Sequence, residues 1–239
     1  MKTAAVDMHC DSISALLEMR RKGTYSAGSG LSSNSLHVDL EKLEKGGYLL
    51  QNFALFVALS ACDDPFRECT ALADLYYEEL EKNKDRIRPV YHYEDIEKNR
   101  AEGKLSALLT VEEGGVCKGR LGNLRLLYRL GVRMLTLTWN FPNELGWPNV
   151  RMREKDSGAA PDFTTPDGEH GLTETGFAFL TEMERLGMIV DVSHLSDAGF
   201  WDVARTANKP FVASHSNARA VCGHVRNLGD DMIRALAEK

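Results

Sequence analysis

Histidine and carboxylate side chains follow several apolar segments of this chain, at the point where each segment ends. His9 and Asp11 come after the short apolar run 4–6 and are separated by one residue. In an extended chain, residues i and i+2 point to the same side, so this imidazole and this carboxylate would project together. Zinc accepts both kinds of ligand. A single His-x-Asp is a weak motif, but it predicts one part of a metal site.

Three more residues of the same chemical kind occupy equivalent positions. They are Glu112 after the run 105–111, His194 after 188–192 and His215 after 210–214. In (β/α) barrels the carboxyl ends of the strands share one face, and the active site is built there. Five ligands on four strand ends therefore predict two metal ions that share a carboxylate. Two ions can hold a hydroxide and polarise a carbonyl, which is the chemistry of amide hydrolysis.

Two similar patterns need separate interpretations. Glu113 follows Glu112 directly, but alternation lets only one of them face the barrel mouth; we favour Glu112 because it ends the apolar run. His37 and Asp39 repeat the His-x-Asp spacing after a loop rich in Ser, Asn and Gly. A helical stretch over 40–45 follows them, so Asp39 is predicted to cap that helix. Position at a strand end, rather than spacing, carries the metal prediction.

The elements that would position these residues alternate between strand-like and helix-like segments, which predicts βα units and a parallel sheet. Six barrel strands are expected near 4–6, 48–58, 105–111, 132–138, 188–192 and 210–214, and a short strand over 87–91 with the helix after it is expected to be an insertion or irregular link. Helices are expected over 65–83, 93–102, 124–130 and 173–186, from Ser196 as the cap through 208, and from about 230 onward. The segment 141–172 lacks periodicity and is rich in turn residues, so a functional loop is expected there. Residues 1–239 are predicted to form a single hydrolase barrel domain.

Composition excludes several classes of protein. A formal net charge of −6 argues against nucleic acid and against an anionic membrane as partners. No apolar run reaches the roughly 18 residues that a membrane span requires. The 5 cysteines are odd in number and scattered, which favours reduced thiols in a cytoplasmic protein.

Taken together, these motifs resemble those of the membrane (renal) dipeptidase family of zinc peptidases, in its bacterial soluble branch. The similarity runs from about residue 6 to the end of the chain. It is carried by Asp-Met-His-Cys-Asp at 7–11, Thr-Val-Glu-Glu-Gly-Gly at 110–115, Leu-Thr-Leu-Thr-Trp-Asn at 135–140, Val-Asp-Val-Ser-His at 190–194, Ala-Ser-His-Ser-Asn-Ala-Arg at 213–219 and Val-Cys-Gly-His-Val-Arg-Asn-Leu at 221–228.

The resemblance implies an amidohydrolase-like (β/α)8 barrel of the TIM type with two zinc ions per subunit. It assigns His9 and Asp11 to one zinc, His194 and His215 to the other, and Glu112 as the bridge between them. A hydroxide bridging the two metals would then attack the peptide bond of a dipeptide. Arg226 matches the family arginine that holds the terminal carboxylate of the substrate, a task suited to its planar fork of donors.

The chain departs from the family pattern in two ways. Some relatives carry a substrate-binding histidine after the Leu-Thr-Leu-Thr strand; here Trp139 stands at that position, with Asn140 beside it as a substitute. The family also uses an aspartate on a later strand to orient the attacking water. The chain is expected to supply six barrel strands and to be truncated after the helix that follows the sixth, so strands seven and eight and this catalytic aspartate are missing and the catalytic residue is unknown.

Other interpretations remain open at this point. A related amidohydrolase that removes the acyl group of N-acyl amino acids is one, since Arg226 would bind that substrate equally well. A metal-binding but catalytically incomplete fragment is another, and hydrogen-bonded rim residues without a metal are a third. The sequence also leaves open the preferred dipeptides, a homodimer, and manganese or cobalt in place of zinc.

Overall fold

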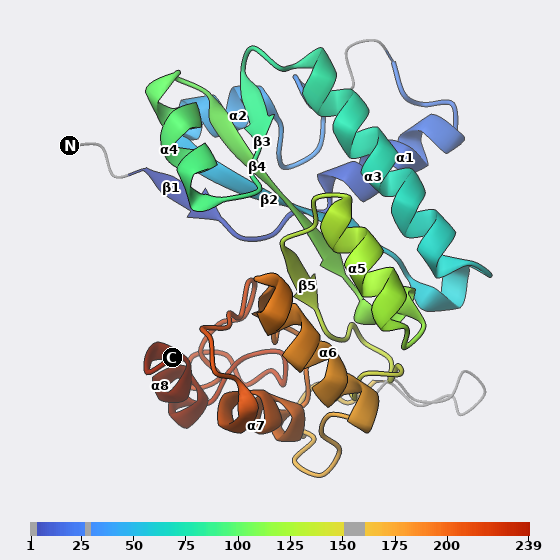
Figure 1. Ribbon diagram of the computed structural model, residues 1–239, viewed down its shortest axis with the longest axis vertical. Helices are drawn as coiled ribbons and strands as arrows, with labels where there is room; N and C mark the ends of the chain where they lie inside the picture. The colour runs from blue at the N-terminus through green and yellow to red at the C-terminus, as the bar shows by residue number, and fades with distance from the viewer. Residues whose placement is uncertain (1–3, 27–29, 151–160) are drawn as a thin grey trace. The chain divides into compact units, whose positions relative to one another are not determined.

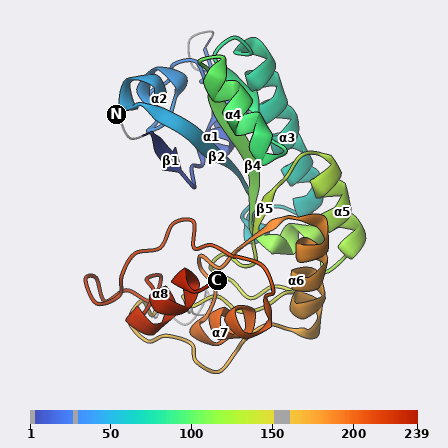
Figure 2. The ribbon, with the colours of Figure 1, turned by 60° about the vertical axis from the view of Figure 1, so that its left-hand side comes forward.

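The computed structural model describes residues 4–26, 30–150 and 161–239. The chain divides into two compact units, residues 1–111 with 129–133 and residues 112–128 with 134–239. Figures 1 and 2 show the helices and strands of each unit.

The first unit is built on parallel strands covered by helices. The strands are β1 (Ala5–Asp7), β2 (Tyr48–Phe56), β3 (Ile87–Pro89) and β4 (Leu105–Glu112), whose last residue belongs to the second unit. β1 pairs with β2, and β3 with β4, in parallel register. The helices are α1 (Ser12–Arg21), α2 (Leu40–Gly46), α3 (Pro65–Lys82) and α4 (Tyr93–Ala101), with a 3-10 turn at Leu59–Ala61.

Local chemistry explains where several of these helices begin. The side chain of Asp39 accepts a hydrogen bond from the backbone N–H of Lys42 at 2.8 Å, which confirms its predicted role as a helix cap. Asp64 caps α3 in the same manner, and Pro65 takes the first position of that helix, where no backbone donor is needed. The helix α1 was not among the predicted elements. Its buried Ile13 and Leu16 are the apolar pair, three residues apart, that faces the core.

The second unit contains shorter strands and the remaining helices. They are β5 (Met134–Thr136) and β6 (Ile189–Asp191), with α5 (Leu121–Arg129), α6 (Glu174–Leu186), α7 (Asp197–Thr206) and α8 (Asp230–Ala237), and a 3-10 turn at Gly114–Cys117. β5 and β6 are parallel. Ser196 caps α7 as predicted, since its hydroxyl accepts the N–H of Gly199 at 3.0 Å.

One predicted strand is much shorter than expected. The segment 210–214 pairs with β6 only through a single bridge between Asp191 and Val212. Pro210 has no N–H to donate, and the chain turns at Ser214 and His215, so the ladder cannot extend in either direction. His215 nevertheless follows the segment 210–214, three residues after the paired Val212, in the sequence position on which the metal prediction rests. Part of the predicted loop 141–172 lies outside the described residues.

Both units therefore follow the strand-then-helix order of an α/β protein, with parallel pairing wherever two named strands of one unit meet. The predicted α/β fold class with parallel strands is confirmed. In the part of the chain that the structure describes, no helix is both long enough and apolar enough to cross a membrane.

Candidate metal centre

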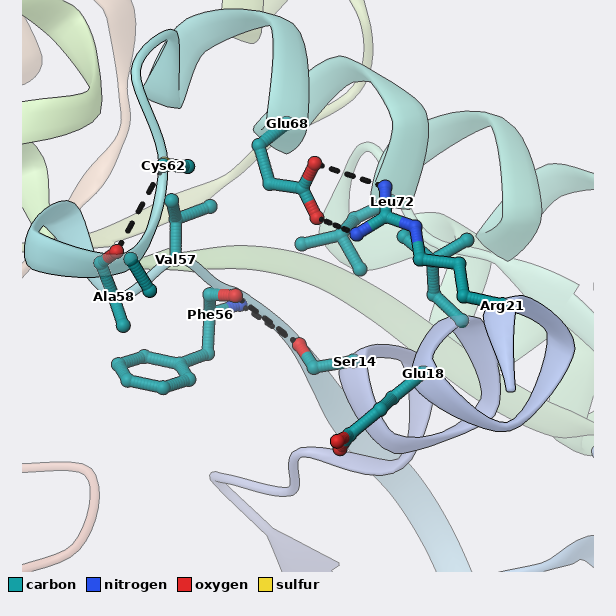
Figure 3. Close-up of a pocket in the computed structure, with 11 residues that line it drawn as sticks. Ser14, Glu18, Arg21, Phe56, Val57, Ala58, Cys62, Glu68 and Leu72 are labelled. Carbon is teal, nitrogen blue, oxygen red and sulfur yellow. Dashed lines mark hydrogen bonds and ion pairs between the residues drawn. The ribbon is translucent and has the colours of Figure 1, made fainter.

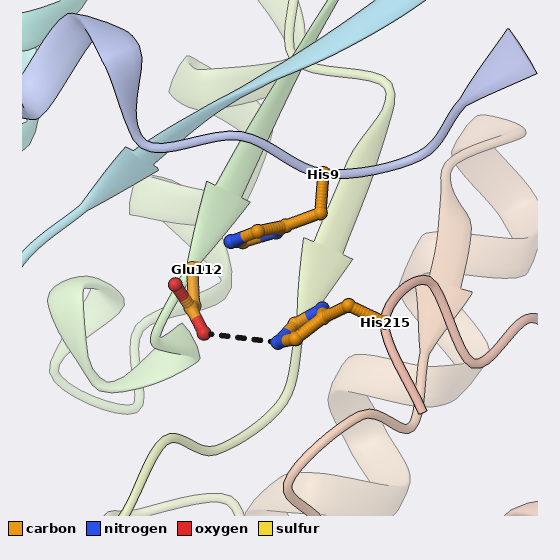
Figure 4. A group of neighbouring side chains, drawn as sticks. All are labelled: His9, Glu112 and His215. Atoms are coloured by element: carbon orange, nitrogen blue, oxygen red, sulfur yellow. Dashed lines mark ion pairs between the residues drawn. The ribbon is translucent and has the colours of Figure 1, made fainter. Parts of the chain in front are cut away.

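The second unit brings together three of the predicted ligands. Oε1 of Glu112, the last residue of β4, lies 2.9 Å from Nε2 of His194 and 3.4 Å from Nε2 of His215. The two Nε2 atoms are 2.9 Å apart. Figure 4 shows the carboxylate of Glu112 directed at the ring of His215. Residues distant in sequence thus present one oxygen and two nitrogens to a single point.

His194 is held by Asn140. The Oδ1 atom of Asn140 lies 2.9 Å from Nδ1 of His194, so Nδ1 carries the proton and Nε2 keeps its lone pair. Burial lowers the pKa of His194 to about 4 despite the opposing effect of Glu112, so the ring is neutral at neutral pH. Its backbone takes the left-handed conformation with φ of 70°, a strained state for a residue other than glycine. Asn140, predicted as a substrate ligand, is also the partner that orients this histidine.

His215 is held by a different group, the hydroxyl of Ser214. Oγ of Ser214 lies 2.7 Å from Nδ1 of His215 and 2.6 Å from Oδ2 of Asp191. An ionised carboxylate can only accept, so the hydroxyl proton points to Asp191 and the hydroxyl oxygen accepts the Nδ1 proton of His215. His215 therefore also presents the lone pair of Nε2.

Asp191, the last residue of β6, was not among the predicted site residues. Its side chain is fully buried and accepts hydrogen bonds from the Thr136 hydroxyl at 2.6 Å and from the backbone N–H groups of Ser193 and Ser214 at 3.0 and 2.9 Å. Although burial opposes ionisation, His215 and these donors lower the pKa of Asp191. The available signal was an acidic residue inside an apolar segment, which is costly without several partners.

The donor set fits a divalent cation. Both imidazoles point lone pairs, rather than protons, at the space shared with the Glu112 carboxylate, and these atoms are only 2.9–3.4 Å apart. Three electron-rich atoms this close repel one another unless a proton or a metal cation lies between them. Two imidazole nitrogens and a carboxylate are typical zinc ligands, and each histidine has the outer hydrogen-bond partner that metal-binding histidines usually have.

Glu113 points elsewhere. Its carboxylate accepts hydrogen bonds from the backbone N–H groups of Gly115 at 2.8 Å and Trp139 at 3.1 Å, and from the side-chain amide of Asn143. Burial raises the pKa of Glu113 to about 7 against these hydrogen bonds. Its left-handed backbone, with φ of 88°, lets two successive glutamates diverge in this way. Of the two glutamates, Glu112 is the one beside the histidines.

The first unit holds the other predicted pair. β1 ends at Asp7, so His9 and Asp11 follow the strand rather than continue it, and Asp11 precedes α1. Nε2 of His9 nevertheless lies 3.5 Å from Oδ1 of Asp11, and the side chain of Asp11 makes no capping hydrogen bond to α1. Both line a cavity of about 390 Å³, together with His37. Cys10 between them is buried, which raises the pKa of its thiol to about 12, so it remains protonated.

The two remaining predicted residues lie in the second unit. Burial lowers the pKa of the Arg226 guanidinium, while the charges of Glu112 and Asp191 act in the opposite direction. Its Nη1 and Nη2 atoms donate to Oγ of Ser216 and to the carbonyl of His215, both at 3.3 Å. The ring of Trp139 lies 6.4 Å from that of His194, centroid to centroid.

A separate cavity of about 380 Å³ in the first unit contains none of the predicted residues (Figure 3). Arg21 there donates to both oxygens of Glu68 at 2.5 and 2.9 Å, and Ser14 bonds the backbone of Phe56. The charges of Arg21 and Glu68 neutralise each other in the lining of the cavity, and the Ser14 hydroxyl is satisfied by the backbone of Phe56. They form no convergent set of ligands.

Comparison with curated proteins and families supports the motif-based expectation. The family model of the membrane dipeptidases (peptidase family M19) matches residues 1–239. An uncharacterized protein in the pqqA 5' region of Klebsiella pneumoniae is 35% identical over 154 residues, which cover 64% of this chain and 53% of that protein. The matched part is thus about half the length of this relative.

Solved structures agree with the family assignment. The crystal structure of dipeptidase AC, a metallopeptidase of family M19, is similar with a TM-score of 0.84 at 27% identity, covering 100% of this chain and 70% of that one. A metallopeptidase from Rhodobacter sphaeroides, liganded with a phosphinate mimic of the dipeptide L-Ala-D-Ala, is similar with a TM-score of 0.82 at 27% identity, covering 98% and 71%. The expected relation to the renal dipeptidase fold is confirmed. This chain belongs to the membrane dipeptidase family, peptidase family M19.

Proposed function

We propose that this chain is the metal-binding part of a zinc-dependent dipeptidase, which hydrolyses the peptide bond of dipeptides. The observation that carries the proposal is the meeting of Glu112, His194 and His215, with both imidazole lone pairs turned to the carboxylate. Family membership supports the same reaction, because the similar solved structures are described as a dipeptidase and a metallopeptidase.

We propose two zinc ions per chain. His194 and His215 would hold one ion, His9 and Asp11 the other, and Glu112 would bridge them. Support for the second pair comes from its ligand types and from the 3.5 Å separation of the imidazole and the carboxylate in the first unit. When bound, the ions would supply Lewis acidity toward the peptide carbonyl and lower the pKa of water.

Arg226 is proposed to bind the terminal carboxylate of the substrate. Its two hydrogen bonds in the described residues are long, at 3.3 Å each, so the guanidinium has N–H groups left for a ligand. A buried cation with spare donors suits a planar carboxylate, which can accept two parallel bonds from it. Trp139, beside His194, is proposed as an apolar wall for the substrate.

A cytoplasmic location is proposed on the basis of the cysteines. Cys10, Cys69 and Cys117 are buried as thiols, and burial raises the pKa of Cys10 and of Cys69 to about 12. Protonated, buried thiols are what a reducing compartment maintains.

The test compares zinc-loaded and chelator-treated protein on a panel of dipeptides and on N-acyl amino acids. The proposal predicts hydrolysis of dipeptides that depends on added zinc. Activity confined to N-acyl amino acids would favour the related amidohydrolase reaction. Binding of zinc without hydrolysis of either class would leave this chain as a catalytically incomplete metal-binding fragment.

A further inference from the structure

Arg226 lies between two residues whose backbone carbonyls are each held by a side chain from elsewhere in the second unit. The carbonyl of Val225 accepts a hydrogen bond from Nδ2 of Asn149 at 2.8 Å. The carbonyl of Asn227 accepts one from Nε of Arg219 at 2.9 Å. The backbone of Arg226 is thus fixed on both sides.

A single carboxylate joins these two supports. Oδ1 of Asp197, the first residue of α7, accepts a hydrogen bond from Nδ2 of Asn149 at 2.7 Å. Arg219 donates to both carboxylate oxygens of Asp197, Nη1 and Nη2 each at 2.7 Å, in the bidentate geometry that gives the strongest ion pairs. We name Asn149, Asp197 and Arg219 the Asp197 bridge.

The Asp197 bridge also reaches the metal centre. The backbone N–H of Asn149 donates to the carbonyl of His194 at 2.8 Å. Oδ1 of Asn149 accepts the backbone N–H of Asp167 at 2.7 Å, so every polar atom of this side chain is used. Asn149 is only 2% exposed, and a buried amide with all its partners present is rigid. One buried residue therefore connects His194, through its backbone N–H, with the residue next to Arg226, through its side chain.

We infer that the Asp197 bridge positions Arg226 relative to His194 and thereby sets the selectivity for substrates with a free terminal carboxylate. This inference rests on the proposed function, because it gives Arg226 a carboxylate to bind. The residues of the Asp197 bridge contact neither the side chains of the metal ligands nor the substrate. They are therefore positioning residues.

The physical reason lies in how weakly the side chain of Arg226 is held. Its own hydrogen bonds are 3.3 Å long, whereas those of the Asp197 bridge are 2.7–2.9 Å. The backbone must therefore provide most of the positional accuracy of the guanidinium. Bidentate recognition loses much of its advantage when the two planes are misaligned, so small shifts would be felt in binding.

The test uses Arg219→Met in the 239-residue chain, with Arg205→Met as the matched control. Arg205 is also an arginine paired with an aspartate of α7, Asp202 at 2.8 Å, but it is exposed and, among the described residues, makes no hydrogen bond to the loop that carries Arg226. Calorimetry on zinc-loaded protein measures the affinity for a phosphinate dipeptide mimic with a terminal carboxylate. The same measurement on the compound with a terminal carboxamide gives the affinity for comparison.

Wild-type protein and Arg205→Met should prefer the carboxylate at least tenfold, and Arg219→Met should reduce this preference at least fivefold with unchanged zinc content. A general loss of structure would weaken both compounds equally and lower the zinc content. Full preference retained in Arg219→Met with unchanged zinc content would overturn the inference. A wild-type protein without preference would instead refute the role proposed for Arg226.

A second measurement needs no ligand. The N–H groups of Val225 and Leu228 are hydrogen-bonded at 2.9 and 2.8 Å to the carbonyls of Phe163 and Asn217. In Arg219→Met these two amides should exchange with solvent deuterium at least fivefold faster, while the amides of α7 keep their rates. Unchanged exchange at both would overturn the inference whatever the ligand result.

Discussion

His194 and His215 present equivalent lone pairs but are oriented by different partners. A neutral amide, Asn140, holds His194, whereas a hydroxyl backed by the buried carboxylate of Asp191 holds His215. Such outer partners fix the tautomer and raise the basicity of a ligating imidazole. The two histidines should therefore respond differently to loss of their partner.

Ser214→Ala should weaken zinc binding by about 10- to 100-fold, the usual effect of losing an outer partner of a metal-binding histidine. The substitution leaves Nδ1 of His215 without its acceptor at 2.7 Å. Competition with a chromophoric chelator measures the affinity. Ser214→Thr keeps a hydroxyl and serves as the control, expected near wild type; equal affinity in wild type and Ser214→Ala would contradict the tautomer assignment.

Glu112→Gln should affect zinc binding, whereas Glu113→Gln should affect stability. Glu112→Gln removes the carboxylate beside both histidines and should reduce zinc binding with little loss of stability. Glu113→Gln turns an amide N–H toward the backbone donors of Gly115 or Trp139 and should cost about 1–3 kcal/mol of unfolding free energy. Urea denaturation and zinc titration of both variants measure these effects. Reduced zinc binding in Glu113→Gln and reduced stability in Glu112→Gln would assign the ligand role to Glu113.

At the scale of helices and strands, the positions of some predicted site residues could be read from the sequence because they lie at strand ends. Glu112 ends the apolar strand β4 and His194 follows the apolar strand β6, and the alternation of strands and helices was visible as periodicity. The roles of Asn140 and Asp191 in orienting His194 and His215 were not predictable in this way, because they depend on partners far away in the sequence. The segment 210–214 read as a strand because it is apolar, yet tertiary geometry limits its pairing to one residue.

Helix α3 shows how a single buried charge can organise one unit. Glu79 is 1% exposed and accepts hydrogen bonds at 2.8 Å from the Tyr25 hydroxyl, the Leu31 N–H and Lys82. Burial opposes its ionisation, but the bonds from Lys82, Leu31 and Tyr25 prevail and lower the pKa of Glu79. The carboxylate thereby fastens the segment before α2 to α3.

Glu79→Gln should lower the unfolding free energy by about 2 kcal/mol at neutral pH, since hydrogen bonds to a charged group are lost. Because the folded pKa of Glu79 is below its ordinary value, its contribution is present above the ordinary carboxyl range and declines as the pH falls through it. Urea denaturation as a function of pH measures both effects. Glu78→Gln, an exposed neighbour paired with Arg20, is the control and should change stability by less than about 0.5 kcal/mol; equal losses in the two variants would contradict the account.

At the scale of the whole molecule, the predicted ligands are distributed over two compact units. His9 and Asp11 belong to the first, and Glu112, His194 and His215 to the second. Family membership and a TM-score of 0.84 to a metallopeptidase support a metal-binding role for this chain. Metal that binds the folded state alone would also stabilise the chain against unfolding.

Zinc content after equilibrium dialysis, measured by mass spectrometry for wild type, His9→Ala and His194→Ala, tests the central claim most directly. The account predicts two zinc ions per wild-type chain and no more than one in either variant, because each substitution removes a ligand of a different ion. A wild-type chain without zinc, or two ions retained in His194→Ala, would contradict it.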